Sequence, residues 1–187
     1  GAEAACDELI RRKFIIDSLK LWLQEYRVDG FRFDLMGLID IETMRQIKAE
    51  LTKIRPDVFL WGEPWTGGST PLTPITDKSQ VRGTGIACFN DTFRDVIKGD
   101  RDGGPPGFIE AGDRVDGIKK GLAGAINDWA LEPAEVVNYF ECHDNLTNWD
   151  KLLQTSGEAS EAEIEQMSRL AALLLFYGLG CLLSVSV

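Results

Sequence analysis

The chain has 187 residues, of which 44% are hydrophobic and 27% charged, the composition of an ordinary soluble globular protein. Its formal net charge of −10 argues against a nucleic-acid partner, because phosphate binding relies on clustered lysine and arginine. No basic amphipathic segment indicates binding to a membrane surface. An acidic surface is compatible with a neutral substrate. The oligomeric state and the compartment stay open, with a slight preference for a soluble, cytoplasmic protein.

The cysteines and the histidine give no pattern typical of a metal site. Cys6, Cys88, Cys142 and Cys181 are widely separated, and His143 is the only histidine. Zinc and redox sites need closely spaced ligands such as a C-x-x-C pair. We therefore predict isolated buried thiols and no metal site, while a disulfide stays open.

Hydrophobic periodicity divides the first part of the chain into alternating helices and strands. Apolar residues at helical spacing predict a helix over residues 7–26 with one wide buried face, followed by a strand over 28–35. A second helix has apolar residues from Ile41 to Ile54 on one face and ends at Pro56. The stretch "DVFLWGEPW" then predicts a short buried strand that Pro64 stops.

The rest of the chain continues the alternation, which predicts an α/β fold with a parallel sheet covered by helices. The predicted elements are a long loop (66–82), a strand (85–91), a helix (92–98), a mobile excursion (99–117), a weaker helix (115–126), a strand in "AEVVNYFECHDN" and a closing helix (158–177).

The run of residues 170–187 carries no charge and is long enough to cross a bilayer. Because it contains glycines and serines, we interpret it as a buried helix followed by a strand-like end. A transmembrane span is the alternative.

A carboxylate lies at the end of each predicted strand: Asp34, Glu63, Asp91 and Asp144. One such residue means little, because aspartate is common in turns. Four in four strands is more informative, because ligands bind at the carboxyl ends of the strands in parallel α/β folds. We therefore predict a ligand site at this edge of the sheet.

The stretch "VDGFRFDLMG" places two charges among phenylalanines, with Arg32 and Asp34 on one strand face. A guanidinium favours the ionised form of its neighbour, as a nucleophilic carboxylate requires, although a structural ion pair explains the same residues. On the next strand, the apolar Trp61 shares a face with Glu63 and favours the protonated form that a general acid requires. Two carboxyl groups in opposite environments indicate glycoside cleavage.

Aromatic side chains and the histidine add a possible sugar-binding surface near the strand ends. A lone histidine is more often structural than catalytic, but His143 adjoins Asp144, which favours a role in binding substrate hydroxyls. Trp65 and Trp149 lie just beyond two of the strands. They either stack on sugar rings or pack under loops.

Three stretches, "DGFRFDLMG", "GEPW" and "YFECHDN", resemble in this order three motifs of the α-amylase family, glycoside hydrolase family 13. The wording "FRFDLMGLID", "GEPWTGG" and "HDNLTNWDKL" resembles the pullulanase-type debranching enzymes in particular, and "FNDTFRDVIKG" fits the same group. The resemblance extends from about Phe14 to Gly178. It implies a (β/α)8 TIM barrel and a retaining hydrolase of α-glucans, acting on α-1,6-glucosidic branch linkages of pullulan, starch or glycogen.

The resemblance also implies the catalytic roles. Asp34 would be the nucleophile and Glu63 the general acid/base. Asp144 would be a third carboxylate that stabilises the transition state and holds sugar hydroxyls.

The expected substrate-binding residues follow from the same motifs. Arg32 would hold the nucleophile ionised, and His143 would bind hydroxyls of the sugar in the cleavage subsite. Trp65, Asn145 and Asp91 would line the cleft. The resemblance implies an α-glucan substrate and no organic cofactor. Calcium occurs in parts of the family, but no motif here indicates a calcium site.

The resemblance covers only part of a barrel. The family's first motif and first three strands have no counterpart, and the sequence departs from the family after Gly178. A complete barrel needs about 250 residues. We therefore expect residues 1–187 to be a fragment of one catalytic barrel domain, strands four to seven. Open sheet edges would leave it marginally stable or self-associating, and inactive alone.

Two alternatives stay open. One is an isoamylase-like, glycogen-debranching or other α-glucan-acting member of the family. The other, from a different class, is a non-catalytic glucan-binding fragment in which the carboxylates only bind sugar.

Overall fold

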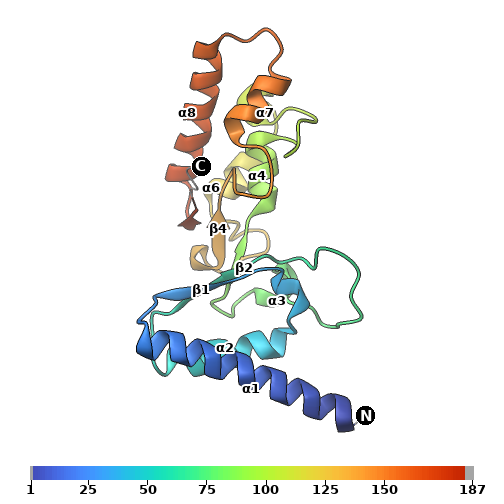
Figure 1. Ribbon diagram of the computed structural model, residues 1–187. Coiled ribbons are helices and arrows are strands. Elements are labelled where there is room, and N and C mark those ends of the chain that lie inside the picture. The colour runs from blue at the N-terminus through green and yellow to red at the C-terminus, as the bar shows by residue number, and fades with distance from the viewer. Residues whose placement is uncertain (1, 184–187) are drawn as a thin grey trace. The chain divides into compact units, whose positions relative to one another are not determined.

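The computed structural model describes the backbone of residues 2–183 and the side chains of residues 8–183, and Figure 1 shows the course of the chain. The chain divides into two compact units, Gly1–Cys88 and Phe89–Val187, and each is described by itself. The strand order in the sheet follows the chain, and the strand pairs β1–β2, β2–β3 and β4–β5 are parallel. The predicted parallel α/β fold is therefore confirmed.

The first unit alternates helices with three parallel strands. Its register places Phe33 opposite Gly62 and Trp61 opposite Ala87. Its elements are α1 (Ala2–Glu25), β1 (Gly30–Phe33), the 3-10 helix η1 (Met36–Leu38), α2 (Ile41–Thr52), β2 (Phe59–Gly62), the short helix α3 (Lys78–Val81) inside the predicted loop, and β3 (Ala87–Phe89).

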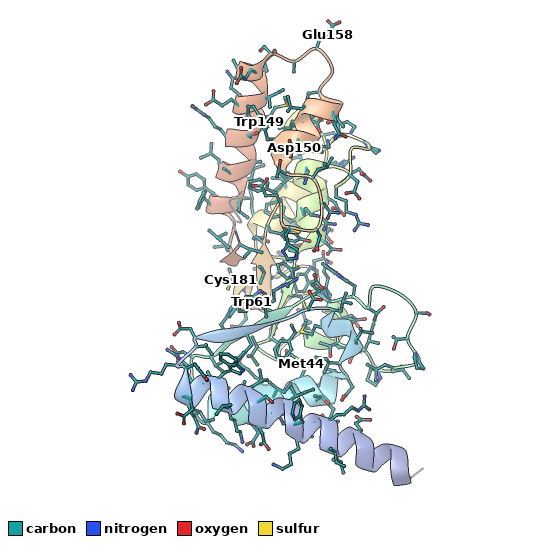
Figure 2. All side chains as sticks on the ribbon, viewed as in Figure 1. Met44, Trp61, Trp149, Asp150, Glu158 and Cys181 are labelled. Atoms are coloured by element: carbon teal, nitrogen blue, oxygen red, sulfur yellow. The ribbon has the colours of Figure 1, made fainter. Side chains whose placement is uncertain are left out.

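Helix α2 packs as its sequence predicts. Asp40 caps its N-terminus by accepting a hydrogen bond from the Thr43 amide at 2.8 Å. The buried face carries Ile41, Ile47, Leu51 and Met44, the last labelled in Figure 2. The helical spacing of apolar residues was sufficient here, because one face of α2 meets the unit's core.

The predicted wide buried face of the first helix is wrong for α1. Among its described side chains, only Ile16 and Leu23 are buried. Helix α1 contacts α2, which lies beside it in Figure 1, and most of its apolar side chains are not covered by this contact. The exposed apolar residues of α1 and the turn after it are Leu9, Ile10, Phe14, Leu21, Trp22 and Tyr26.

The second unit contains mostly helices. Its elements are α4 (Asp91–Lys98), α5 (Phe108–Ala111), α6 (Val115–Leu122), the 3-10 helix η2 (Pro133–Glu135), β4 (Val136–Asn138), α7 (Asn148–Thr155), α8 (Glu161–Tyr177) and β5 (Cys181–Leu182). Helix α5 lies inside the predicted mobile excursion, and α7 was not predicted at all.

The uncharged run at the end of the chain also differs from its interpretation as a buried helix. Leu173, Phe176 and Tyr177 of α8 are exposed, because only one side of α8 packs on the unit. Short strand β5 follows, and residues 184–187 lie outside the described residues. Over the described part of the chain, we find no helix with the length and apolar character needed to cross a membrane.

An apolar cluster and a buried ion pair hold the second unit together. The Lys151 ammonium is fully buried and contacts Glu110, whose side chain is only 7% exposed. Thr155 donates a further hydrogen bond to Glu110 at 2.6 Å. The ion pair joins α7 to α5 beside a cluster formed by Phe93, Ile97, Ile109, Ile118, Leu152, Ile164 and Ala171.

Replacing Lys151 by methionine should destabilise the protein by about 3–5 kcal/mol, because it leaves the Glu110 carboxylate buried without its cation. The double variant Lys151→Met/Glu110→Leu should recover most of this loss. Chemical denaturation measures both, with Lys119→Met as control, since Lys119 is exposed. Equal effects of the buried and exposed substitutions would contradict this assignment.

The same ion pair predicts how stability depends on pH. Burial alone would raise the pKa of Glu110, but hydrogen bonds from Lys151 and Thr155 outweigh it and lower the pKa below the ordinary value of 4.5. A carboxyl with a depressed folded pKa contributes stability above its unfolded pKa and loses it as the pH falls. Unfolding between pH 6 and pH 3 should therefore show a loss of stability below about pH 4.5 that is smaller in the double variant.

Candidate active site

The side chain of Arg32 brings two of the predicted carboxylates together. Its Nη2 atom lies 3.1 Å from Asp34 Oδ1 and 2.9 Å from Glu63 Oε1. The parallel register of β1 and β2 causes this, because the strands end opposite each other at Phe33 and Gly62 and a carboxylate follows each of them. Asp34 is 71% exposed, whereas Glu63 is 7% exposed. One accessible and one buried carboxylate therefore share one cation.

A backbone amide fixes the second oxygen of Glu63. Leu35 N–H donates to Glu63 Oε2 at 2.7 Å. Leu35 has φ 42°, in the left-handed region that side chains other than glycine rarely adopt. Such strain is tolerated where the surrounding structure over-determines it and is concentrated at functional sites. The turn after β1 thus serves to orient the carboxylate that follows β2.

The surroundings of Glu63 differ from the apolar wall expected from the sequence. The Trp61 ring stacks on Phe59, with 5.0 Å between ring centroids. Both oxygens of Glu63 accept hydrogen bonds, one from a guanidinium and one from an amide. These contacts fix the orientation of the carboxyl group. Arg32 therefore pairs with Glu63, which follows the neighbouring strand, as well as with Asp34.

Gly37 lets the turns after β1 and β2 approach each other. Its N–H lies 3.1 Å from the Trp65 carbonyl oxygen and 3.3 Å from that of Glu63. A Cβ atom at this position would lie only 2.5 Å from the same Trp65 oxygen. The structure thus places Trp65 in the same unit as Asp34 and Glu63, with its ring partly buried.

His143 and Asp144 lie in the second unit, in the connection between β4 and α7. His143 Nε2 is 3.3 Å from Asp144 Oδ1, and both side chains are exposed. Asp144 Oδ2 also contacts Cys142 Sγ at 3.8 Å. The prediction that they end a strand is wrong, because β4 stops at Asn138, the last residue that pairs with β5.

The other two predicted residues lie in the second unit as well. Asn145 donates from Nδ2 to Asp102 Oδ1 at 3.0 Å. Asp91 opens α4, where an acidic residue is favourable near the helix N-terminus. Asn90 caps that helix by accepting from the Phe93 amide at 3.2 Å. Asp91 therefore has a structural explanation beside the cleft role predicted for it.

Sequence reasoning missed one residue that contacts the segment carrying Asp144. Lys98 of α4 is buried, and its ammonium donates to the Leu146 carbonyl oxygen. A signal was present, because Arg94 and Lys98 are four residues apart and adjoin the apolar Phe93 and Ile97. The signal was weak, because lysine and arginine are mostly exposed and are fully buried only when they are paired.

The described cysteines are free thiols, with Cys88 buried and both Cys142 and Cys181 partly exposed. The side chain of Cys6 lies outside the described residues. Among the side chains from residue 8 to residue 183, no group of three or more His, Cys, Asp or Glu is arranged to hold a metal ion.

Known proteins are similar to this chain over most of its length. The pullulanase of Bacillus subtilis strain 168 is 38% identical over 96% of this chain. The solved pullulanase of Bacillus acidopullulyticus superposes with a TM-score of 0.88 at 41% identity, over 92% of this chain. A mutant pullulanase of Paenibacillus barengoltzii, complexed with maltotetraose, gives 0.85 at 42% identity over 93%. This chain resembles a segment of pullulanases.

The matched segment is short relative to these pullulanases. The chain spans 26% of the Bacillus subtilis protein, 22% of the Bacillus acidopullulyticus chain and 29% of the Paenibacillus barengoltzii chain. No family model matches it. The parallel strands and the superposition with pullulanases confirm the predicted fold class, a partial α/β barrel.

Substituting Gly37 should test the contact between the two turns. Gly37→Ala should destabilise the protein by about 1–3 kcal/mol, because the added methyl group overlaps the Trp65 carbonyl. Gly68→Ala is the matched control, since nothing lies within 4 Å of its added Cβ. Chemical denaturation should show the loss for Gly37→Ala alone. Equal stability of the two variants would mean that the turns do not constrain each other.

Proposed function

We propose that this chain carries catalytic residues of a retaining glycoside hydrolase that cleaves α-1,6-glucosidic branch linkages in α-glucans. The observation that carries the proposal is the contact of Arg32 with both Asp34 and Glu63. The similarity to pullulanases supports the reaction class. The solved pullulanase complex with maltotetraose supports an α-glucan as substrate.

The spacing of the two carboxylates supports the retaining mechanism. Their contacting oxygens share one nitrogen at 3.1 Å and 2.9 Å, so these oxygens are at most about 6 Å apart. Retaining glycosidases hold their carboxyl groups about 5–5.5 Å apart, whereas inverting enzymes need about 6.5–9.5 Å for an intervening water. A bound of about 6 Å is nearer to the retaining range than to the inverting one, which supports the proposed mechanism.

The proposed roles of the two carboxylates come from the motif positions, and the exposure of Asp34 is compatible with them. Asp34, the exposed carboxylate, attacks the anomeric carbon and forms a covalent glycosyl intermediate. Glu63 donates a proton to the leaving glycosidic oxygen, then takes a proton from the water that hydrolyses the intermediate. Arg32 offsets the charge that returns to both carboxylates during the cycle.

The remaining assignments rest on the resemblance of the motifs. Asp144 acts as the third carboxylate that stabilises the transition state. His143 binds sugar hydroxyls, and its contact with Asp144 orients the ring. Trp65, Asn145 and Asp91 take substrate-binding roles by the same resemblance.

Replacing either carboxylate by its amide should strongly slow pullulan cleavage by the full-length protein that carries this sequence. Glu63→Gln should lower kcat by about 10²–10⁴-fold, the usual contribution of general acid–base catalysis. Asp34→Asn should lower it at least as much, because no covalent intermediate forms. Release of reducing ends from pullulan measures both effects.

Asp17→Asn is the control for these variants, because Asp17 is an exposed residue of α1 that pairs with Lys13. Full activity of Asp34→Asn would remove the nucleophile role. Cleavage of linear amylose with pullulan left intact would remove the α-1,6 assignment. Binding of pullulan without cleavage by the unaltered protein would favour the glucan-binding alternative.

The configuration of the product tests the retaining mechanism directly. Two successive displacements at the anomeric carbon should release the new reducing end first as the α anomer. Proton NMR during the first minutes, before mutarotation, distinguishes the anomers. Initial release of the β anomer would indicate inversion and contradict the carboxylate spacing.

A further inference from the structure

The segment of residues 141–147, which we call the Asp144 loop, lacks regular secondary structure and connects β4 to α7. It carries the exposed His143 and Asp144 side chains, which contact each other, and Asp144 also contacts Cys142. These contacts all lie within the loop itself. The position of the Asp144 carboxylate therefore depends on what holds the loop backbone.

Lys98 holds the far end of this loop. It is the last residue of α4 and only 1% exposed. Its ammonium donates a hydrogen bond to the backbone carbonyl oxygen of Leu146, two residues after Asp144. Figure 1 shows the connection between β4 and α7 running beside α4. Because the acceptor is a backbone atom, the contact restrains the loop backbone directly.

Burying this ammonium is unfavourable without a counter-charge. Burial lowers the pKa of Lys98, the charge of Glu141 opposes that effect, and Arg94 and Lys151 add to it. An apolar residue would avoid the cost, whereas an unpaired buried cation is costly. The hydrogen bond to the Leu146 carbonyl offsets part of the cost of burying the ammonium.

Glu141 holds the near end of the loop. Its Oε2 atom accepts a hydrogen bond from the Asn148 amide at 2.7 Å. Asn148 is the first residue of α7, and its side chain is buried. The first residue of the loop thus binds the helix that begins where the loop ends. Amides at a helix N-terminus lack partners within the helix, so a carboxylate that accepts from one of them is favourable.

We propose that Lys98 and Glu141 together form a clamp that positions the Asp144 loop for catalysis. Both are positioning residues, since they act through the backbone that carries Asp144. The inference rests on the proposed function for the role of Asp144. The clamp itself concerns only the second unit and can be measured without any reaction.

The test replaces Lys98 by methionine, which has a similar length and no donor, in the full-length protein that carries this sequence. Lys120→Met is the matched control, because Lys120 lies on α6 and is exposed. Two readouts are compared. One is the rate at which iodoacetamide labels Cys142, measured by mass spectrometry of its peptide. The other is kcat and KM on pullulan.

Loss of the clamp should speed Cys142 labelling about tenfold, because a charge-assisted hydrogen bond no longer opposes local opening. It should lower kcat about 10–100-fold, with a smaller change in KM, since misplaced catalytic groups mainly affect the chemical step. Lys120→Met should change neither readout. Unchanged labelling in Lys98→Met would overturn the clamp.

The two proposals fail separately. If the unaltered protein does not cleave pullulan, the proposed function is lost, while the labelling rates still decide the clamp. If Lys98→Met labels faster but keeps its kcat, the loop is clamped and the positioning role is wrong.

A second variant covers the case in which Lys98→Met loses its circular dichroism signal. Glu141→Gln keeps an oxygen that accepts from the Asn148 amide but removes the charge that faces Lys98. It should raise Cys142 labelling severalfold with an unchanged helix signal. Labelling at the unaltered rate would then overturn the clamp.

Discussion

The candidate site depends on one cation held between two carboxylates. Arg32 reaches Asp34 and Glu63 with a single nitrogen, which is possible because β1 and β2 are parallel and in register. Two carboxylates this close repel each other, and a cation between them offsets that repulsion. The buried position of Glu63 strengthens both effects, since water screens it poorly. The Arg32 guanidinium therefore links the ends of β1 and β2 at this edge of the sheet.

Backbone geometry supplies the precision that the side chains need. The left-handed Leu35 turns its amide onto Glu63, and Gly37 allows the turns after β1 and β2 to touch. Neither residue contributes a reactive group. Both fix the direction of a carboxylate that follows a neighbouring strand, which is why a strained turn is retained there.

The second unit uses buried lysines for a comparable purpose. Lys151 joins α7 to α5 through Glu110, and Lys98 joins α4 to the Asp144 loop. Each ammonium is almost fully buried, so each depends on the oxygen that it contacts. Buried charges of this kind make one arrangement of helices and loops more favourable than others, because any alternative leaves a charge unpaired.

The sequence by itself determined the alternation of helices and strands, the buried face of α2, and the carboxylates that follow β1 and β2, because these features repeat with the local helical or strand period. Only the tertiary structure decided that Arg32 also binds Glu63, that β4 ends well before Asp144, and that much of α1 is exposed. These depend on which segments meet. Arg32 and Glu63 are 31 residues apart, and local periodicity carries no information about contacts at that separation.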